Sequence, residues 1–499
     1  MAHASAKQNN IFSSLVAFDG GLNVADDPAG LPDNQLAEAL NLYYAEGRSV
    51  LTTRPGLVHV SGPPPGNPDI LALHWYAKDV DSGFLIAATS DGKLHSLDLS
   101  AQPPAWSPVA DLDQPGVTPS LVTFHGKLVI ADGGPHLRTW DGMALETVSS
   151  SPSATALVEV GGRLAANSAQ DLDGVAFSGP FDETDWDIGE GAVFLRAGYG
   201  DGLRVNAFGV IGRDLVVFKS GDASRRILRL QTDGTVDQWS ITELSRNQSA
   251  SGPRAVEFVG NNLFFAGHGG IMDLAGVQQY GDIQVGVAGR PVNPLLGGRN
   301  VSSMRFVPAL GAMLVFIEGD PQVLAFHPHN QAWTRFDFQG RIMADACQAG
   351  GTVFLAGRGG SVYRLGPEES RDEILPGGQA NITSTVRSKV FTTQGALVLR
   401  SAKLDFEALS PGSGALQVLG SDQVSPVELI TWSANPGLGK LSDATGPLAD
   451  AAEVLGVSAQ TKSVSRTRFR DWAVSFQLTT TGGRIRLRRC QAEFARVNG

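Results

Sequence analysis

The chain has 499 residues and a formal charge of −11, with 42% hydrophobic and 18% charged residues. This hydrophobic fraction excludes a disordered chain, and the acidic balance excludes a protein that binds duplex DNA through an overall basic surface. The two cysteines, Cys347 and Cys490, are too few for a disulfide framework or a cysteine-rich zinc module. No apolar run reaches the roughly 18 residues of a transmembrane helix, so we expect no membrane partner.

Residues 1–66 are expected to form an N-terminal arm with one short helix. Asp33 can cap that helix, and Leu36, Leu40 and Tyr43 then fall on one helical face. An apolar face needs a surface to cover, so the arm should pack on the rest of the chain rather than hang free. The proline-rich segment 63–68 marks the end of the arm.

Residues 67–375 carry a repeat. Each copy has a short apolar strand, a glycine turn and a second apolar strand; the copies begin at Leu85, Leu128, Leu164, Leu215, Leu263, Leu314 and Val353. Their mean spacing of about 45 residues is typical of a four-stranded propeller blade. The sequence therefore predicts an all-β chain whose centre is a six- or seven-bladed β-propeller. The alternative is an array of β-sandwiches with accidental periodicity.

Residues 376–499 are expected to form a C-terminal β-sandwich-like docking domain. Apolar and polar residues alternate from Leu397 to Phe406 and from Trp472 to Leu478, which is the pattern of half-buried strands. The charge of the chain is uneven here. Residues 461–499 hold nine Lys or Arg against two acidic residues, a local charge of +7, so the remainder of the chain carries −18.

Signatures of enzymes are missing from the sequence. It contains no phosphate-binding loop of the G-x-x-x-x-G-K-[ST] type, no H-E-x-x-H helix and no G-x-S-x-G elbow. The pair His327 and His329 lacks identifiable further metal ligands. The acidic candidates cannot be placed at a catalytic separation; they are Asp19, Asp182, Glu183, Asp185 and Asp187. We therefore expect no enzyme activity, catalytic residue, cofactor or metal.

An arginine strand near the C-terminus is the most specific chemical feature. Arg484, Arg486 and Arg488 share one face at period two, and Arg489 follows them. Such guanidinium groups can contact DNA phosphates or an acidic partner. The competing interpretation is an exposed edge strand that charge protects from aggregation.

Four tryptophans stand at similar places in their repeats: Trp106, Trp140, Trp239 and Trp333. We expect them to pack blade against blade rather than to bind sugars, because large aromatic side chains are needed to fill the space between sheets.

Several segments together resemble a known family. The resemblance lies in F-D-G-G-L-N at Phe18–Asn23, L-P-D-N-Q at Leu31–Gln35, Asn41–Leu42, T-R-P-G at Thr53–Gly56, V-A-F-S-G-P-F-D-E-T-D-W at Val175–Trp186 and the arginine strand. In this order they resemble the β-propeller virion proteins of tailed bacteriophages. These proteins are the tail nozzle, tail hub or packaged-DNA stabilisation proteins of short-tailed phages.

The resemblance implies a structural protein without catalytic residues. Such proteins form a ring, often a hexamer, below the portal and adaptor, where they close the channel, retain DNA and later pass it during ejection. It implies a location in the virion tail after synthesis in the host bacterial cytoplasm. An acidic body is compatible with DNA passage because like charges repel. The alternative is a receptor- or glycan-binding propeller, which exposed aromatic residues on one face would favour. A carbohydrate-active propeller enzyme is a further alternative.

Overall fold

The structure is a computed structural model that describes residues 11–16, 18–45, 50–79, 82–189, 191–222, 224–277, 282–434, 458–465 and 470–497. Strands dominate these residues, which contain one short α-helix, α1 (Asn293–Leu296), and the 3-10 turns η1 (Val236–Gln238), η2 (Pro253–Ala255) and η3 (Pro308–Leu310). None of these helices has the length and apolar run that crossing a membrane requires. The chain divides into two compact units, each described separately below.

The propeller unit comprises residues His59–Val323 and Gly340–Leu365. Five antiparallel four-stranded sheets follow one another along the chain: β6 (Ile70–Ala77), β7 (Gly83–Thr89), β8 (Lys93–Asp98) and β9 (Ala105–Asp111); β10 (Ser120–Phe124), β11 (Lys127–Ala131), β12 (Leu137–Trp140) and β13 (Leu145–Val148); β14 (Leu157–Val160), β15 (Arg163–Asn167), β16 (Gly174–Phe177) and β17 (Val193–Arg196); β18 (Arg204–Ile211), β19 (Asp214–Ser220), β20 (Arg225–Gln231) and β21 (Ser240–Ser245); β22 (Val256–Val259), β23 (Asn262–Gly267), β24 (Gly270–Val277) and β25 (Asp282–Gly286).

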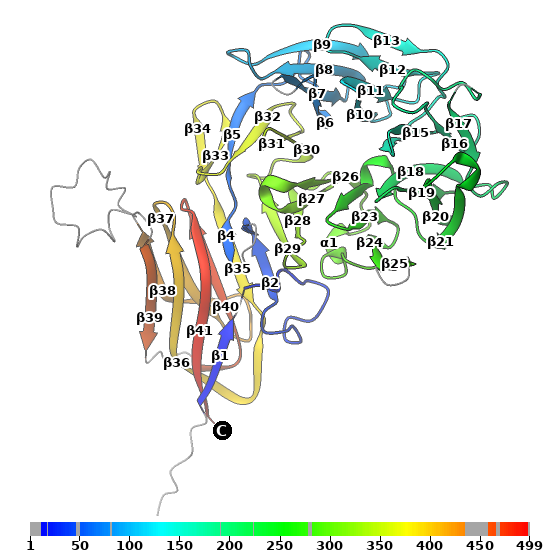
Figure 1. Ribbon diagram of the computed structural model, residues 1–499. Coiled ribbons are helices and arrows are strands. Elements are labelled where there is room, and N and C mark those ends of the chain that lie inside the picture. Colours follow the sequence, from blue (N-terminus) through cyan, green and yellow to red (C-terminus); the bar gives the residue numbers. More distant parts are fainter. Residues whose placement is uncertain are drawn as a thin grey trace, which may run out of the picture. The chain divides into compact units, whose positions relative to one another are not determined.

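Two further strand sets complete the ring. A sixth four-stranded sheet contains β30 (Met343–Ala349), β31 (Thr352–Gly357), β32 (Val362–Gly366) and β5 (Gly56–Ser61), a strand from before the first repeat. The first two strands at the remaining position are the antiparallel pair β26 (Val301–Val307) and β27 (Ala312–Ile317). The first strands of successive sets contact one another in turn, and β30 contacts β6 (Figure 1). The predicted propeller is therefore confirmed.

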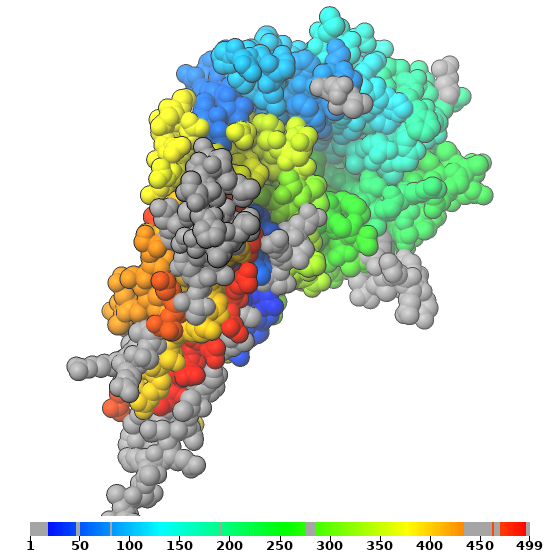
Figure 2. Space-filling view, turned by 60° about the vertical axis from the view of Figure 1, so that its left-hand side comes forward, coloured from blue at the N-terminus to red at the C-terminus, as the bar shows by residue number. Residues whose placement is uncertain are grey.

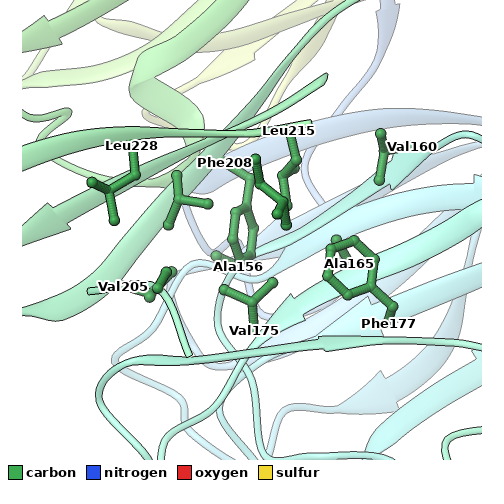
Figure 3. Packing of buried hydrophobic residues seen from close by; sticks show 12 residues of the cluster. Ala156, Val160, Ala165, Val175, Phe177, Val205, Phe208, Leu215 and Leu228 are labelled. Atoms are coloured by element: carbon green, nitrogen blue, oxygen red, sulfur yellow. The ribbon is translucent and has the colours of Figure 1, made fainter. Parts of the chain in front are cut away.

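The repeat in the sequence has a simple structural meaning. Every residue that begins a copy lies in the second strand of a set and is buried: Leu85, Leu128, Leu164, Leu215, Leu263, Leu314 and Val353. Neighbouring sheets pack face to face through such residues. Between two of them, Val175 and Phe177 of β16 meet Phe208 and Leu215 of the next sheet (Figure 3). Burying these faces is what a single blade could not do alone.

The large-sheet unit comprises the described residues of Met1–Val58, Leu324–Gln339 and Gly366–Gly499. One group of its strands has the order β39–β36–β41, with β1 and the pair β4–β3 on the far side of β41; a second group has the order β38–β37–β40–β35–β2–β29. These strands are β1 (Ile11–Val16), β2 (Leu36–Leu40), β3 (Leu42–Tyr44), β4 (Leu51–Thr53), β29 (Ala332–Asp337), β35 (Thr383–Ser388), β36 (Phe391–Ala408), β37 (Gly412–Leu419), β38 (Pro426–Ala434), β39 (Ser458–Ser465), β40 (Arg470–Thr481) and β41 (Ile485–Val497).

The two strand groups pack against each other as in a β-sandwich. Phe406 of β36 lies 4.9 Å from Trp432 of β38, and Phe476 of β40 lies 5.9 Å from Phe494 of β41, measured between ring centroids. The hairpin β33 (Arg371–Leu375) and β34 (Gly378–Asn381) stands apart from both groups, and β28 (Gln322–His327) carries the chain from one unit into the other. The predicted β-sandwich-like C-terminal part is thus present, joined by N-terminal strands and by residues 324–339.

The predicted helix at residues 33–43 is wrong. Those residues form β2 and β3, and Asn41 between them has φ of 58°, a left-handed conformation that breaks any helix. β2 pairs with β35 on one side and with β29 on the other, so strand pairing decides the local structure over a helical spacing of apolar residues. The arm is not a free tail, since Leu36 is fully buried.

The N-terminal and C-terminal segments meet within the large-sheet unit. β1 and β4 both pair with β41, the last strand of the chain. In the space-filling view the blue N-terminal residues lie against the red C-terminal strands (Figure 2). The predicted segments 1–66, 67–375 and 376–499 follow chain order, whereas the compact units interleave along the chain.

Candidate functional site: the motif residues and the arginine strand

Two N-terminal motif residues, Asn41 and Arg54, meet at one buried polar junction in the large-sheet unit. Arg54, from the R-P-G segment, is fully buried and forms a two-pronged ion pair with Asp372, with N–O distances of 2.9 and 2.6 Å. The guanidinium also donates to the backbone oxygen of Asp337 at 2.7 Å and lies 4.5 Å from the centre of the Phe338 ring. A fork-shaped cation with this many partners fixes several chain segments at once.

Asn41 completes the junction. Its side-chain oxygen accepts from Arg54 Nε at 2.9 Å and from the backbone N–H of Asp337 at 2.8 Å, while its Nδ2 donates to the backbone oxygen of Thr383 at 2.8 Å. All hydrogen-bonding capacity of the amide oxygen is thereby used within the fold. The asparagine and arginine of the motif therefore hold β2, β29 and β35 together rather than face a ligand.

Glycines of the motifs allow close backbone approach. A Cβ on Gly56 would lie 2.0 Å from the backbone oxygen of Arg371, and a Cβ on Gly21, where φ is 67°, would lie 2.7 Å from the backbone nitrogen of Trp333. Neither site has room for a side chain. Asn23, at the end of G-G-L-N, closes its loop by accepting from the N–H groups of Ala25 and Asp26.

The arginine strand is an interior strand, so the edge-strand interpretation is wrong. β41 pairs with β36 along one side, and with β4 and β1 along the other. A register shift opposite Asp405 and Phe406 leaves Arg488 without a direct partner residue on β36. This bulge exposes Arg488 and Arg489 together, at 56% and 48% of their side-chain surface.

Carboxylates of β36 neutralise much of this arginine charge. Arg486 lies 2.6 Å and Arg488 3.5 Å from the same oxygen of Glu407, and Arg489 lies 2.7 Å from Asp405. Arg484 precedes β41, is nearly buried, and has the exposed Glu368 at 3.6 Å. The structure thus brings Arg486 and Arg488 together, as the alternation predicted, but leaves only Arg488 and Arg489 half exposed to meet a partner.

Three of the four tryptophans pack between propeller sheets as predicted, and Trp333 instead packs in the large-sheet unit. Trp140 is buried and Trp106 partly buried between neighbouring sheets of the ring, and Trp239 lies 5.0 Å from Phe177. Trp333 is buried in the large-sheet unit beside Phe326. Trp140 and Trp333 are buried and so out of reach of a ligand. Trp239 is only partly buried and also lines a surface pocket with Arg163 and Thr235.

Phe181 and Tyr199, the two most exposed aromatic residues among the described residues of the ring, lie on different faces. Phe181 follows the third strand of its sheet and Tyr199 follows the fourth, so their loops emerge on opposite faces of an up-and-down blade. The feature that would favour a glycan-binding propeller is therefore not seen in these loops.

Three of the histidines and acidic residues noted in the sequence, His327, Asp182 and Glu183, have structural partners. His327 is buried, with Nε2 3.0 Å from Thr334 Oγ1, and burial lowers its pKa to about 3. Asp182 accepts from Thr184, which holds the pKa of this carboxyl low, and Glu183 pairs with Lys127 at 2.8 Å. Within the described ranges, no three His, Cys, Asp or Glu side chains are grouped so as to hold a metal. Cys347 and Cys490 are both free thiols.

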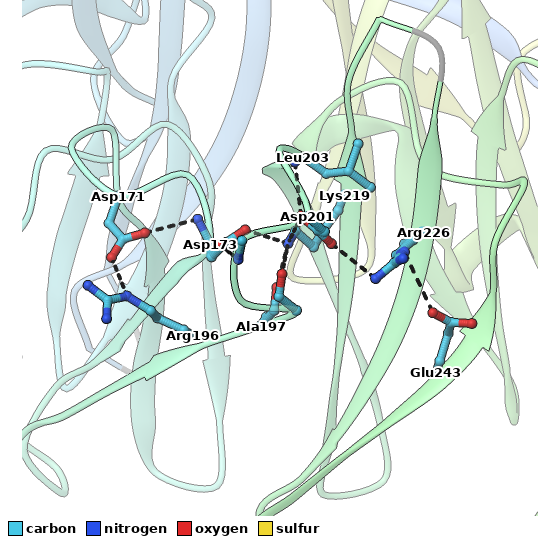
Figure 4. A network of polar contacts seen from close by, with 11 residues as sticks. Asp171, Asp173, Arg196, Ala197, Asp201, Leu203, Lys219, Arg226 and Glu243 are labelled. Atoms are coloured by element: carbon cyan, nitrogen blue, oxygen red, sulfur yellow. Dashed lines mark hydrogen bonds and ion pairs between the residues drawn. The ribbon is translucent and has the colours of Figure 1, made fainter.

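Sequence reasoning missed a buried lysine in the propeller. Lys219 of β19 has a fully buried side chain, and its Nζ lies 2.7 Å from both Asp173 and Asp201 and donates to the backbone oxygen of Ala197 (Figure 4). Burial favours the neutral form of Asp173, but the hydrogen bonds from Lys219 and Gly200 hold the pKa of its carboxyl below the usual range. The sequence signal was a charged residue inside an otherwise apolar strand, L-V-V-F-K.

No protein-family model and no curated protein matches the chain. Among solved structures it is similar to BamB from Moraxella catarrhalis, at 11% identity over 63% of this chain and 97% of that chain, with a TM-score of 0.41. It is also similar to the Cps50 (Swd1) β-propeller domain of Myceliophteria thermophila, at 12% identity over 62% and 99%, with a TM-score of 0.42. PorZ of Porphyromonas gingivalis is similar at 13% identity over 62% and 37%, with a TM-score of 0.38. These likenesses concern the fold alone.

Proposed function

We propose that this protein is a structural component of a tailed-phage virion. In this proposal it forms a nozzle or hub ring, for which a hexamer is the expected stoichiometry, below the portal and adaptor. The ring closes the tail channel, retains packaged DNA and passes it on ejection. The proposal assigns no catalytic step to any residue.

One observation carries the proposal: the residues of the resemblance act as one structural device. Asn41 and Arg54 meet at one buried junction with Asp372, and Gly56 packs tightly against the backbone of the neighbouring Arg371. Motifs of a structural family are expected to fix the fold in this way, whereas catalytic motifs place polar groups in an accessible cleft. The burial of these residues therefore supports a structural role over an enzymatic one.

The arginine strand supplies the contact that the proposal needs. Arg488 and Arg489 are half exposed on a chain whose remaining segments are strongly acidic, so they can bind an acidic surface of a neighbouring ring or a DNA end. Their acidic partners Glu407 and Asp405 hold them in place but leave guanidinium donors facing outward.

The experiment that tests this function is peptide mass spectrometry of density-banded phage particles from the source culture. The amount of the chain is scaled to the major capsid protein. We expect a few copies per particle, in a fixed ratio that corresponds to one ring. Absence from purified particles would overturn the proposal and direct attention to glycan-array and hydrolase assays.

A second experiment addresses the contact itself. Replacing Arg488 and Arg489 with serine should weaken assembly with the neighbouring tail ring or retention of DNA. If DNA is the partner, the slope of log K against log salt should fall by about 1.8, since each phosphate contact contributes about 0.9. Arg213→Ser is the matched control because Arg213 is exposed and pairs loosely with Asp233. Equal behaviour of the double variant and the control would remove the arginines from the proposal.

A further inference from the structure

A polar cavity lies on the axis of the propeller ring. Its volume is about 120 Å³, enough for several water molecules. The first strands of several sets form its wall, with residues from β6, β10, β14 and β26, and η2 supplies the remainder. Because these strands belong to distant parts of the sequence, only the closed ring creates this cavity.

Two arginines line the cavity. Arg254 of η2 has only 10% of its side chain exposed; it pairs with Asp345 of β30 at 2.6 Å and donates through Nη1 to the backbone oxygen of Leu71. Arg305 of β26 has 27% of its side chain exposed, so the cavity is reachable from solvent. Its Nε lies 3.1 Å from Asp345.

Asp345 has no capacity left for a further cation. One of its oxygens accepts from Ser303 at 2.7 Å, and the other accepts from the backbone N–H of Leu73 at 2.8 Å. Arg254 and Arg305 supply the remaining contacts. Burial alone would raise the pKa of Asp345, but the two arginines hold it below its usual range, so this carboxyl is ionised.

Arg254 keeps an unsatisfied donor. Its Nε is buried and has no hydrogen-bond partner among the described residues. A buried, charged donor without an acceptor is costly, and in native proteins such a group is normally met by water or a ligand. Asp345 balances one of the two arginine charges, and the second is balanced only to the extent that Glu257, 3.8 Å from Arg305, is ionised.

Of the other titratable groups described around the cavity, Glu257 of β22 is the one that can balance this charge, since it lies 3.8 Å from Arg305. Burial lowers the pKa of His74 on β6 to about 4, and its Nε2 is held by Thr123, so the ring is neutral. Burial raises the pKa of the Cys347 thiol on β30, which is neutral as well. Burial raises the pKa of Glu257 to about 7, with Arg305 opposing, so this carboxyl loses its charge as pH falls and the positive charge of the arginines is then less balanced.

We propose that the axial cavity is a binding site for a small oxyanion, a phosphate or carboxylate group, held between Arg254 and Arg305. An oxyanion supplies the acceptors that the guanidinium donors lack and neutralises the positive charge that Glu257 leaves unbalanced when it is protonated. The volume of the cavity admits a single phosphate or carboxylate group rather than a nucleic acid strand. This site does not depend on the proposed virion function.

The test is thermal unfolding of the full chain with increasing inorganic phosphate, at constant ionic strength set by chloride and at pH 6.5. The melting temperature of the wild type should rise with phosphate, because a ligand that binds only the folded state stabilises it. Acetate, tested in parallel, distinguishes recognition of carboxylate from recognition of phosphate. R254Q and R305Q should each weaken phosphate binding about tenfold or more, the range for a hydrogen bond to a charged group.

R138Q is the matched control. Arg138 of β12 pairs with Asp132 at 2.6 Å and has the same 10% side-chain exposure as Arg254, but it does not line the cavity. R138Q should melt at a lower temperature yet keep the phosphate-dependent rise. R305Q, whose side chain is partly exposed, keeps the test valid if R254Q does not fold. Absence of a phosphate effect in the wild type, or an unchanged effect in R305Q, would overturn the proposal.

Discussion

At the scale of single residues, buried charges with several partners hold each unit together. Arg54 does so in the large-sheet unit and Lys219 in the propeller, each with acidic partners within 3 Å. A buried ion pair is not necessarily more stable than a well-packed apolar pair. Removing one partner, however, leaves the other charge buried and uncompensated, so these residues are sensitive points.

The first prediction concerns Arg54. Replacing it with methionine should lower the free energy of unfolding by about 3–5 kcal/mol, because Asp372 is then buried without its cation. Urea unfolding followed by tryptophan fluorescence measures this change. Arg213→Met is the control, since its exposed pair with Asp233 should contribute at most about 1 kcal/mol. Equal effects of the two substitutions would show that the Arg54 junction adds nothing beyond an exposed pair.

The second prediction concerns Lys219 and pH. In the wild type the lowered pKa of Asp173 stabilises the fold above its unfolded pKa of about 3.9, and this contribution is lost as pH falls through the folded value. In K219M the hydrogen bond from lysine is missing, so burial dominates and raises the pKa of Asp173. The free energy of unfolding of the variant should therefore decrease as pH rises, because the buried carboxyl is then ionised without its cation. The stability difference between wild type and variant should therefore grow from pH 4.5 to pH 7.5. A difference that stays constant over this range would contradict the assigned role.

At the scale of elements, strand pairing overrides local patterns. The spacing of Leu36, Leu40 and Tyr43 suits a helix, but β2 is hydrogen-bonded between two other strands and Asn41 ends it in a left-handed conformation. The arginine strand shows the same effect, because its alternation could not reveal that β1, β4 and β36 flank it.

The third prediction concerns β1. Removing residues 1–17 should leave the β41 residues Cys490–Ala495 without their β1 partners and open a strand edge. We expect the shortened chain to form larger assemblies than the full chain as protein concentration rises. Light scattering coupled to size-exclusion chromatography measures the molar mass of these assemblies. Removing only residues 1–10 keeps β1 and is the control. If both shortened chains behave like the full chain, β1 does not protect β41.

At the scale of the whole molecule, the chain forms two units with separate cores that interleave along the sequence. Closure of the propeller ring and assembly of the large sheet both need segments that are distant in the chain. Such non-local pairing is expected to form slowly, because loop-closure entropy is lost before the contacts form.

The fourth prediction follows from the two cores. Calorimetric unfolding of the full chain should show two transitions. R54M should lower the temperature of one transition, and K219M should lower the other, because each residue belongs to a different unit. A single transition that both substitutions shift equally would mean that the units unfold as one cooperative structure.

The sequence by itself determined the propeller. Repeated apolar strands with glycine turns encode hairpins locally, and all residues that begin the repeats became buried second strands. The alternation of apolar and polar residues after residue 397 likewise predicted strands with one buried face, as in a β-sandwich. These features are readable because they depend on neighbours a few residues away.

Only the tertiary structure decided the rest. Four features depend on partners that are distant in the sequence, in some cases by several hundred residues. They are the strands within residues 36–44, the interior position of β41, the Arg54–Asp372 ion pair and the ion pairs of Lys219. The axial cavity exists only when the ring closes, since Arg254 comes from η2, Arg305 from β26 and Asp345 from β30. Local composition does not reveal such long-range pairing. The same short sequence can be stable in a helix, in an edge strand or in an interior strand, and which of these forms depends on the segments that pack against it.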